Sequence, residues 1–485
     1  MNNTLLIVLL WPLVSMVLSL LPAKEAAGKT AFALSLAGLL LSVYLFLGFV
    51  PANGMQQVMS YAWIPALGIS FKIGMDGISL LLIMLTNVLT PLIILSSFGR
   101  KIENPKAFYA LILLMQFAML GVFVALDGFL FYIFWELALI PIYFICLLWG
   151  GKDRVRITLK FFIYTLTGSL LMLVSLIYLY LQTPDTHTFD IDAFYQLKLS
   201  GSQQAFVLWT MFFAFAVKIP IFPLHSWQPD TYVDAPTPGT MLLSGIMLKM
   251  GIYGLLRWLL PTVPAAVHEY GFLIMAFCVA GVVYASCIAI VQKDFKRLVA
   301  YASIAHVGLI SAGVFTLNSE ATEGAVFQML SHGVNAVGLF FIADILMTRL
   351  KTRNLAELGG IVNNQKLFAI AFMIIMLGTV ALPLTNGFVG EFLLLTGIYA
   401  YHKWMAFFAG LSVILGVVYM FRSYQAIMLG SRHLSDSDFS PLTISEKTVL
   451  VSVAALVVLM GIFPSVLLDT ASPSVKALLS LINAQ

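Results

Sequence analysis

The sequence is a succession of apolar segments, each about long enough to cross a lipid bilayer. A helix needs about 20 mostly apolar residues for this. Only 10% of the 485 residues are charged, whereas about a quarter are charged in a typical soluble domain. We therefore predict an all-α polytopic membrane protein with about 14 transmembrane helices, and one membrane domain over residues 1–485. The predicted spans are 3–21, 30–49, 75–98, 108–126, 128–149, 159–181, 204–222, 239–260, 270–291, 299–317, 323–347, 366–399, 406–429 and 447–468.

The distribution of Lys and Arg predicts how these spans are oriented. Counted from the first span, the odd-numbered loops hold nineteen of the 26 basic residues and the even-numbered side holds five, with Lys218 and Lys249 inside spans. Basic residues concentrate in cytoplasmic loops, so both termini should lie on the outer, periplasmic side of a cell inner membrane. The segment "SPSVKALLSLINAQ" is expected to form a short amphipathic helix on that outer surface.

Cofactor and nucleic-acid signals are absent from the sequence. The three cysteines, Cys146, Cys278 and Cys287, lie in apolar runs without a metal-ligand spacing, and are expected to be buried and inert. No glycine-rich nucleotide-binding motif occurs, and no basic tract suggests nucleic acid. A function based on a metal or a nucleotide bound by this chain is therefore not expected.

Six ionisable residues lie well inside the predicted spans. An ionisable side chain at the bilayer centre costs roughly 2.5–3.5 kcal/mol on insertion scales, so it persists where it is paired, hydrated or functional. These residues are the candidates for a proton path, although a role in helix packing is the alternative for each, above all for the histidines. They are Glu136, Lys218, Lys249, His306, His332 and Glu391.

Two glycines and an arginine follow Lys249 in the eighth span. Gly251 and Gly254 follow one turn later and would leave room for a neighbour or for water. Arg257, two turns beyond the lysine, is expected to extend its guanidinium to the membrane surface.

The segment "AFAVKIPIFPLHSWQPDTY" places Lys218 directly before two helix breakers. Pro220 and Pro223 lack an N–H, so two backbone carbonyls beside the lysine lose their helical partners. Irregular backbone at membrane depth survives where it is buried in protein or lines water. The prolines are therefore predicted to open the seventh span so that the lysine can meet water and a proton partner.

The twelfth span has a similar interruption. The segment 366–399 is too long for one straight helix, and we expect a break from Pro383 to Gly390, just before Glu391. The two interrupted spans are five apart, so equivalent helices run in opposite directions. Such pairs indicate inverted repeats around a midplane ion site. We predict five-helix repeats over 108–260 and 270–429, with broken helices 7 and 12.

Several motifs resemble one family closely. "AFAVKIPIFPLHSWQPDTYVDAPTPGTMLLSGIMLKMGIYGLLRW", "QKDFKRLVAYASIAHVGLI", "QMLSHGV" and "NGFVGEF" resemble the antiporter-like subunits of proton-pumping NADH:quinone oxidoreductase (complex I). The similarity runs from about residue 70 to 430. A glutamate at position 391, where sister subunits carry lysine, favours the branch called subunit M (chain 4 in mitochondria).

The resemblance implies a function and a role for each candidate. It implies that Glu136 forms an ion pair with Lys218 that is coupled to proton movement. Lys249, His306 and His332 would relay protons, and Glu391 would pass them outward. It further implies that flavin, iron–sulfur clusters and quinone are bound by other subunits of the complex. The expected partners of this chain are membrane subunits, including sister antiporter-like subunits, and membrane lipids.

Two alternatives to this function remain. The chain could be a subunit of a multisubunit cation/proton antiporter or of a membrane-bound hydrogenase, which resemble the same family. It could also be a membrane scaffold whose intramembrane charges only hold helices together. On the scaffold hypothesis, neutralising Glu136 or Lys218 would impair assembly rather than turnover.

Overall fold

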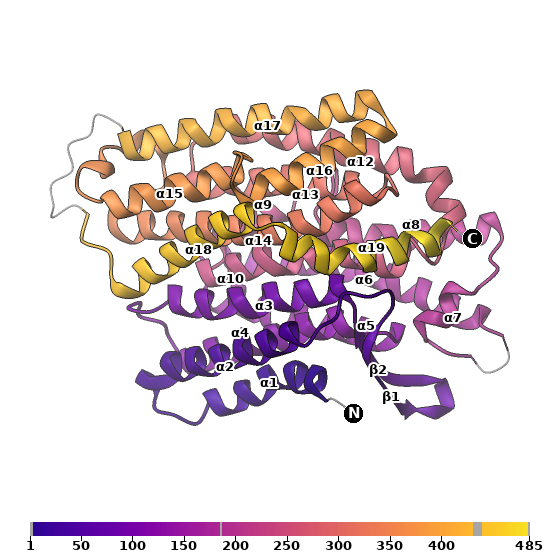
Figure 1. Ribbon diagram of the computed structural model, residues 1–485. Helices are drawn as coiled ribbons and strands as arrows, with labels where there is room; N and C mark the ends of the chain where they lie inside the picture. The colour runs from indigo at the N-terminus through magenta and orange to yellow at the C-terminus, as the bar shows by residue number, and fades with distance from the viewer. Residues whose placement is uncertain (1–2, 185–186, 430–438, 484–485) are drawn as a thin grey trace.

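The computed structural model describes residues 3–184, 187–429 and 439–483. Its long helices run side by side in one bundle, and a β-hairpin, α7 and both termini lie toward the same end (Figure 1). The helices are α1 (Thr4–Ser19), α2 (Ala27–Leu47), α3 (Gly77–Ser96), α4 (Pro105–Val124), α5 (Gly128–Trp149), α6 (Arg154–Gln182), α7 (Ile191–Tyr195), α8 (Gly201–Lys218), α9 (Gln228–Asp234), α10 (Thr237–Leu242), α11 (Leu248–Gly254), α12 (Pro264–Val291), α13 (Phe295–Val314), α14 (Ser319–Leu350), α15 (Lys366–Thr379), α16 (Asn386–Tyr401), α17 (Lys403–Tyr424), α18 (Ile444–Ile462) and α19 (Ser465–Asn483).

Each predicted span coincides with helical structure. Among the described residues, twelve helices are long and apolar enough to cross a membrane, and α1 and α15 are apolar but shorter. One of the twelve, α19, was predicted to be only a short surface helix. It begins at Ser465 and packs against α3 and α14, and its Ser474 hydroxyl accepts a hydrogen bond from the Gly77 N–H at 2.8 Å.

The predicted break in the seventh span is confirmed. Helix α8 ends at Lys218 and α9 begins at Gln228, because Pro220 has no N–H to continue the helix and disfavours helical geometry in the residue before it. The loop expected between the seventh and eighth spans is partly helical, because it contains α9. Asp230, in α9, forms ion pairs with Arg297 of α13, at 2.9 Å, and with Lys160 of α6, at 3.5 Å.

The twelfth span is also broken, but its break is shorter than predicted. It covers residues 380–385, between α15 and α16, and the expectation that it extends to Gly390 is wrong. Gly387 and Gly390 lie inside α16. They serve close packing, since a Cβ atom at Gly387 would lie 2.0 Å from the Gly378 carbonyl oxygen of α15.

The eighth span contains two π-helical turns, η3 (Leu243–Met247) and η4 (Leu255–Leu259), on either side of α11. The space expected beside Gly251 and Gly254 is filled by protein. A Cβ atom at Gly251 would lie 2.5 Å from the Ile219 side chain, and one at Gly254 would lie 2.4 Å from the Phe215 ring. These glycines let α11 approach α8 closely.

The segment before α3 forms an antiparallel hairpin of β1 (Gln56–Ile64) and β2 (Ile69–Met75). Lys72 in β2 binds Asp190, at 2.7 Å, and Asp192, at 2.8 Å, beside α7. Burial lowers the pKa of Lys72, but the hydrogen bonds to the two aspartates outweigh it and raise the pKa. The hairpin and α7 thus cap one end of the bundle together.

Two expectations about single residues are wrong. Arg257 does not reach the membrane surface, because it is buried in an ion pair with Asp76, the N-cap residue of α3. The Tyr195 hydroxyl also donates to the Arg257 carbonyl at 2.7 Å. Cys287 is exposed, whereas Cys146 and Cys278 are buried as expected.

Candidate functional site

Four of the six candidate residues form one buried series across four helices. The Lys249 Nζ atom, on α11, lies 2.8 Å from Nδ1 of His332 on α14. The rings of His332 and His306, on α13, have centroids 5.9 Å apart. His306 Nδ1 then lies 3.0 Å from Oε1 of Glu391, on α16. The series therefore begins in the eighth span and ends beyond the break in the twelfth.

A close helix crossing positions Lys249 against His332. Gly245, in the π turn η3, faces Gly333 of α14, and a Cβ atom at Gly333 would lie 2.7 Å from the Gly245 carbonyl oxygen. Lys249 Nζ also donates to the Ser244 carbonyl at 2.6 Å. π turns are frequent at functional sites, and here the turn supplies an acceptor for a buried ammonium group.

We predict that Gly333→Ala separates Lys249 from His332. The added methyl group would meet backbone rather than a movable side chain, so α14 must shift away from the eighth span. Gly410→Ala is the matched control, since a Cβ atom there would meet nothing within 4 Å. We expect Gly333→Ala to lower turnover of the assembled complex and Gly410→Ala to leave it unchanged. Equal activity of the two variants would contradict this role for the crossing.

Uncharged polar residues surround the two histidines. With His306 and His332, Ser303, Gln328, Asn335 and Thr379 line a small cavity of about 20 Å³, which is room for about one water molecule. Gln328 donates to Glu391 Oε1 at 3.2 Å. Because these side chains are not ionisable, the intramembrane charges that mark the candidates in the sequence do not include them. Amides inside apolar spans were the signal that could have found them.

The remaining two candidates form a separate group. Lys218 is buried at the end of α8, with its Nζ 4.7 Å from the centre of the Trp135 ring. Glu136 follows this tryptophan on α5 and interacts electrostatically with Lys218. The direct ion pair that the resemblance implies does not form in the described part of the chain, where Glu136 Oε1 has no hydrogen-bond partner.

Among the described residues, the pair Glu136 and Lys218 and the series that begins at Lys249 are connected by the packing of their helices and not by hydrogen bonds. Lys249 is directed to Ser244 and His332, and within the described ranges no hydrogen bond joins it to Lys218. The helices α8 and α11 that carry the two lysines nevertheless pack together. A change in charge on one lysine can therefore act on the other through the electric field, which is strong in a low-dielectric interior.

The hydrogen-bonding capacity of these groups determines where protons can sit. A lysine ammonium group has only donors, so His332 Nδ1 accepts from Lys249 and the neutral ring then carries its proton on Nε2. Within residues 3–184, 187–429 and 439–483, Nε2 of His332 and both ring nitrogens of His306 lack a hydrogen-bond partner, although His306 Nδ1 lies close to Glu391. Among these residues no group of three or more His, Cys, Asp or Glu could hold a metal ion. The arrangement suits proton transfer.

Comparisons with known proteins identify the family and the fold of the chain. Residues 125–416 match the family described as NADH:quinone oxidoreductase/Mrp antiporter, TM. The chain is 41% identical to NADH-quinone oxidoreductase subunit M of Rickettsia conorii, over 90% of this chain and 89% of that one. A chain of respiratory complex I from Thermus thermophilus has a TM-score of 0.92 at 29% identity, covering 99% of both chains.

The fold extends to a second kind of complex. A chain of the Mrp complex from Dietzia sp. has a TM-score of 0.83 at 20% identity, covering 97% of this chain and 52% of that one. At this identity the likeness shows a shared fold alone. The relatives at higher identity decide the family: the chain belongs to the antiporter-like, proton-translocating membrane subunits of NADH:quinone oxidoreductase, in the subunit M branch.

Proposed function

We propose that this chain carries protons through Lys249, His332, His306 and Glu391, driven by quinone reduction elsewhere in the complex. The observation that carries the proposal is the series of contacts that joins these four residues across α11, α14, α13 and α16. Each of the four is more than nine-tenths buried. Ionisable groups are costly at such positions, and a connected set of them in one place supports a shared task.

The relay follows from what each group can donate. When Lys249 gives a proton to His332 Nδ1, the imidazole can release its other proton from Nε2 into the cavity that it shares with His306. One water molecule in that cavity would connect the two rings. His306 then holds the proton beside Glu391, 3.0 Å away. The carboxylate is the last acceptor of the series.

Glu136 and Lys218 control the relay by charge in this proposal. Glu136 carries the charge opposite to that of a Lys218 ammonium and interacts with it electrostatically, and this attraction changes with the distance between the two side chains. Because Lys218 lies on the helix that packs against the Lys249 helix, its charge state biases the first transfer of the series. The break after Lys218 gives the backbone freedom to move the lysine toward or away from the glutamate.

We also infer the setting of the chain. The excess of basic residues in odd-numbered loops supports a cell inner membrane with both termini on the outer, periplasmic side. Other membrane subunits, including sister antiporter-like subunits, would be the partners, with flavin, iron–sulfur clusters and quinone bound outside this chain. The breaks in the seventh and twelfth spans support inverted repeats over 108–260 and 270–429.

Glu391→Gln in the assembled complex tests the path. The amide keeps the shape of the side chain but cannot take up a proton, so we expect NADH-driven proton uptake into inverted membrane vesicles to lose most of its rate. Quinone reduction should fall with it. Glu320→Gln is the matched control, because Glu320 is exposed in the first turn of α14.

Each other outcome points to a different function. Unchanged proton uptake in Glu391→Gln would contradict the path and direct attention to cation/proton antiport or to a hydrogenase complex. Loss of the subunit from the complex, with normal rates per assembled complex, would favour the scaffold hypothesis.

A further inference from the structure

A polar vestibule opens at the end of the bundle away from the chain termini. It has a volume of about 540 Å³, and its lining includes residues from the ends of α3 and α14 and from the start of α13. These helix ends lie at the end of the bundle opposite the chain termini (Figure 1). Its wall includes the exposed Lys152 and the half-buried Asp234. None of the six candidate residues lines it.

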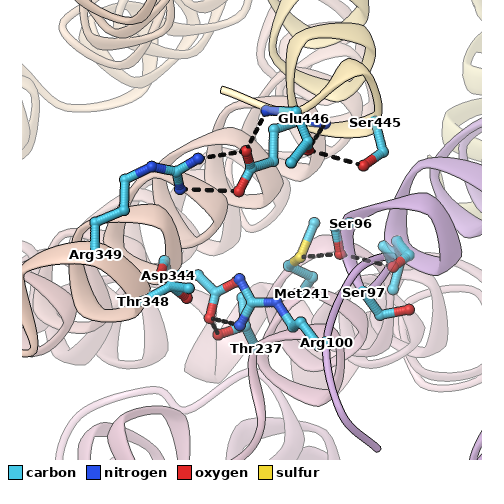
Figure 2. Close-up of polar contacts among 12 residues, drawn as sticks. Ser96, Ser97, Arg100, Thr237, Met241, Asp344, Thr348, Arg349, Ser445 and Glu446 are labelled. Atoms are coloured by element: carbon cyan, nitrogen blue, oxygen red, sulfur yellow. Dashed lines mark hydrogen bonds and ion pairs between the residues drawn. The ribbon is translucent and has the colours of Figure 1, made fainter. Parts of the chain in front are cut away.

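Anchored charges form the floor of the vestibule. Asp344 of α14 pairs with Arg100, after α3, and accepts a hydrogen bond from the Thr237 hydroxyl of α10 at 2.7 Å; Figure 2 shows the three side chains converging. Lys296 of α13 is buried and donates to the Ala235 carbonyl at 2.8 Å. These contacts hold the charged side chains at the inner end of the vestibule. Water is therefore expected to enter the space between the helices there.

The vestibule lies in line with the histidine cavity. Both are lined by α13 and α14. On α13, Lys296 lines the vestibule and Val299 lines the cavity, and three residues of helix span about 4.5 Å. On α14, Asp344 lines the vestibule and Leu339 the cavity, a separation of about 7.5 Å.

We propose that the vestibule is the aqueous entrance to the histidine cavity, with Val299 and Leu339 as a thin apolar barrier between them. Water that crosses this barrier reaches Ser303 and the ring of His306 directly. The entrance thus lies between α13 and α14 rather than beside Lys218. That protons use it rests on the proposed function, whereas access of water-sized solutes to the cavity can be tested separately.

A small thiol-reactive ion tests the entrance. Ser303→Cys places a thiol on the cavity wall, and Ser311→Cys is the matched control, two turns further along α13, fully buried and outside the cavity lining. Lys152→Cys reports on the vestibule. Each of these three cysteine variants is made in a chain in which Cys146, Cys278 and Cys287 have been replaced by alanine. The assembled complex in vesicles of either orientation is exposed to Ag⁺ in chloride-free buffer, then denatured and alkylated to count free thiols.

We expect Ag⁺ to block Lys152→Cys quickly and Ser303→Cys more slowly, both from the side away from the termini, and to leave Ser311→Cys free. Adding Val299→Phe should slow the reaction of Ser303→Cys only. Three results would overturn the proposal: equal protection of Ser303→Cys and Ser311→Cys, access to Ser303→Cys from the termini side alone, or an unreactive Lys152→Cys.

The assay does not depend on turnover, so its result is separate from that of the Glu391→Gln test. If the cysteine-free chain does not assemble, the same three variants are compared in the native background, with wild-type labelling subtracted. In that background Cys287 is exposed and Cys146 and Cys278 are buried, so the baseline for this chain, separated from its partner subunits after alkylation, is expected to be about one reactive thiol. A normal entrance together with unchanged proton uptake in every relay variant would mean that the cavity is accessible but that the proposed function is wrong.

Discussion

Lys249→Met should lower NADH-driven quinone reduction and proton uptake together by roughly a hundredfold, the lower range of what a positioned proton-transfer group contributes. The lysine is fully buried and makes the first contact of the series, 2.8 Å from His332 Nδ1. Methionine has a similar length and suits an apolar site, so the helix crossing should survive. Both rates are measured in inverted vesicles and normalised to the assembled complex.

The control for this variant is Lys476→Met, which removes an exposed lysine on α19. It should leave both rates at the wild-type level. If Lys249→Met instead pumps normally, the series is a structural network, because a relay cannot continue without its first donor. If quinone reduction persists while proton uptake stops, the lysine belongs to the path and its removal uncouples proton transfer from the redox reaction.

Arg257→Met should destabilise the chain by about 3–5 kcal/mol and remove it from the complex, because breaking a buried ion pair leaves an uncompensated charge. Asp76 and Arg257 have side chains only 4% and 7% exposed. The pair joins the start of α3 to the end of the eighth span. The measurement is the amount of subunit retained in purified complex, together with the temperature at which the complex dissociates.

The double variant Asp76→Asn/Arg257→Met separates charge from packing. Asparagine keeps an oxygen that can accept from the Ser79 N–H, as Asp76 does at 2.9 Å, but leaves no buried charge. We expect it to recover much of the assembly that Arg257→Met loses. Lys198→Met, in a polar loop near the same end, should assemble normally. If the double variant assembles no better than Arg257→Met, packing rather than charge makes Arg257 important.

The helices and their breaks could be predicted largely from local sequence. Apolar length predicted the spans, and the prolines after Lys218 and before Glu391 predicted the two interruptions, because a missing N–H acts within one turn of helix. The exact end of the second break could not be predicted. A glycine at position 387 could either interrupt a helix or allow two helices to pack closely. Its close approach to Gly378 of α15 shows that it allows close packing.

The partners of the charged residues could not be predicted in the same way. Arg257 and Lys249 lie two turns apart in the sequence, yet one is neutralised by an aspartate 181 residues away and the other faces a histidine 83 residues away. Gln328 and Asn335 join the site only because α14 passes through the centre of the bundle. Spacing along a helix says which side chains share a face, but not which helix that face meets.

By itself the sequence determined that the chain is a helical membrane protein, which residues carry intramembrane charge, and where two helices break. These properties follow from hydrophobicity and from backbone chemistry within a few residues. The tertiary structure decided that Lys249, His332, His306 and Glu391 form one series while Glu136 and Lys218 form another. That division depends on how close two helices can come, and at Gly245 and Gly333 the absence of side chains sets the distance.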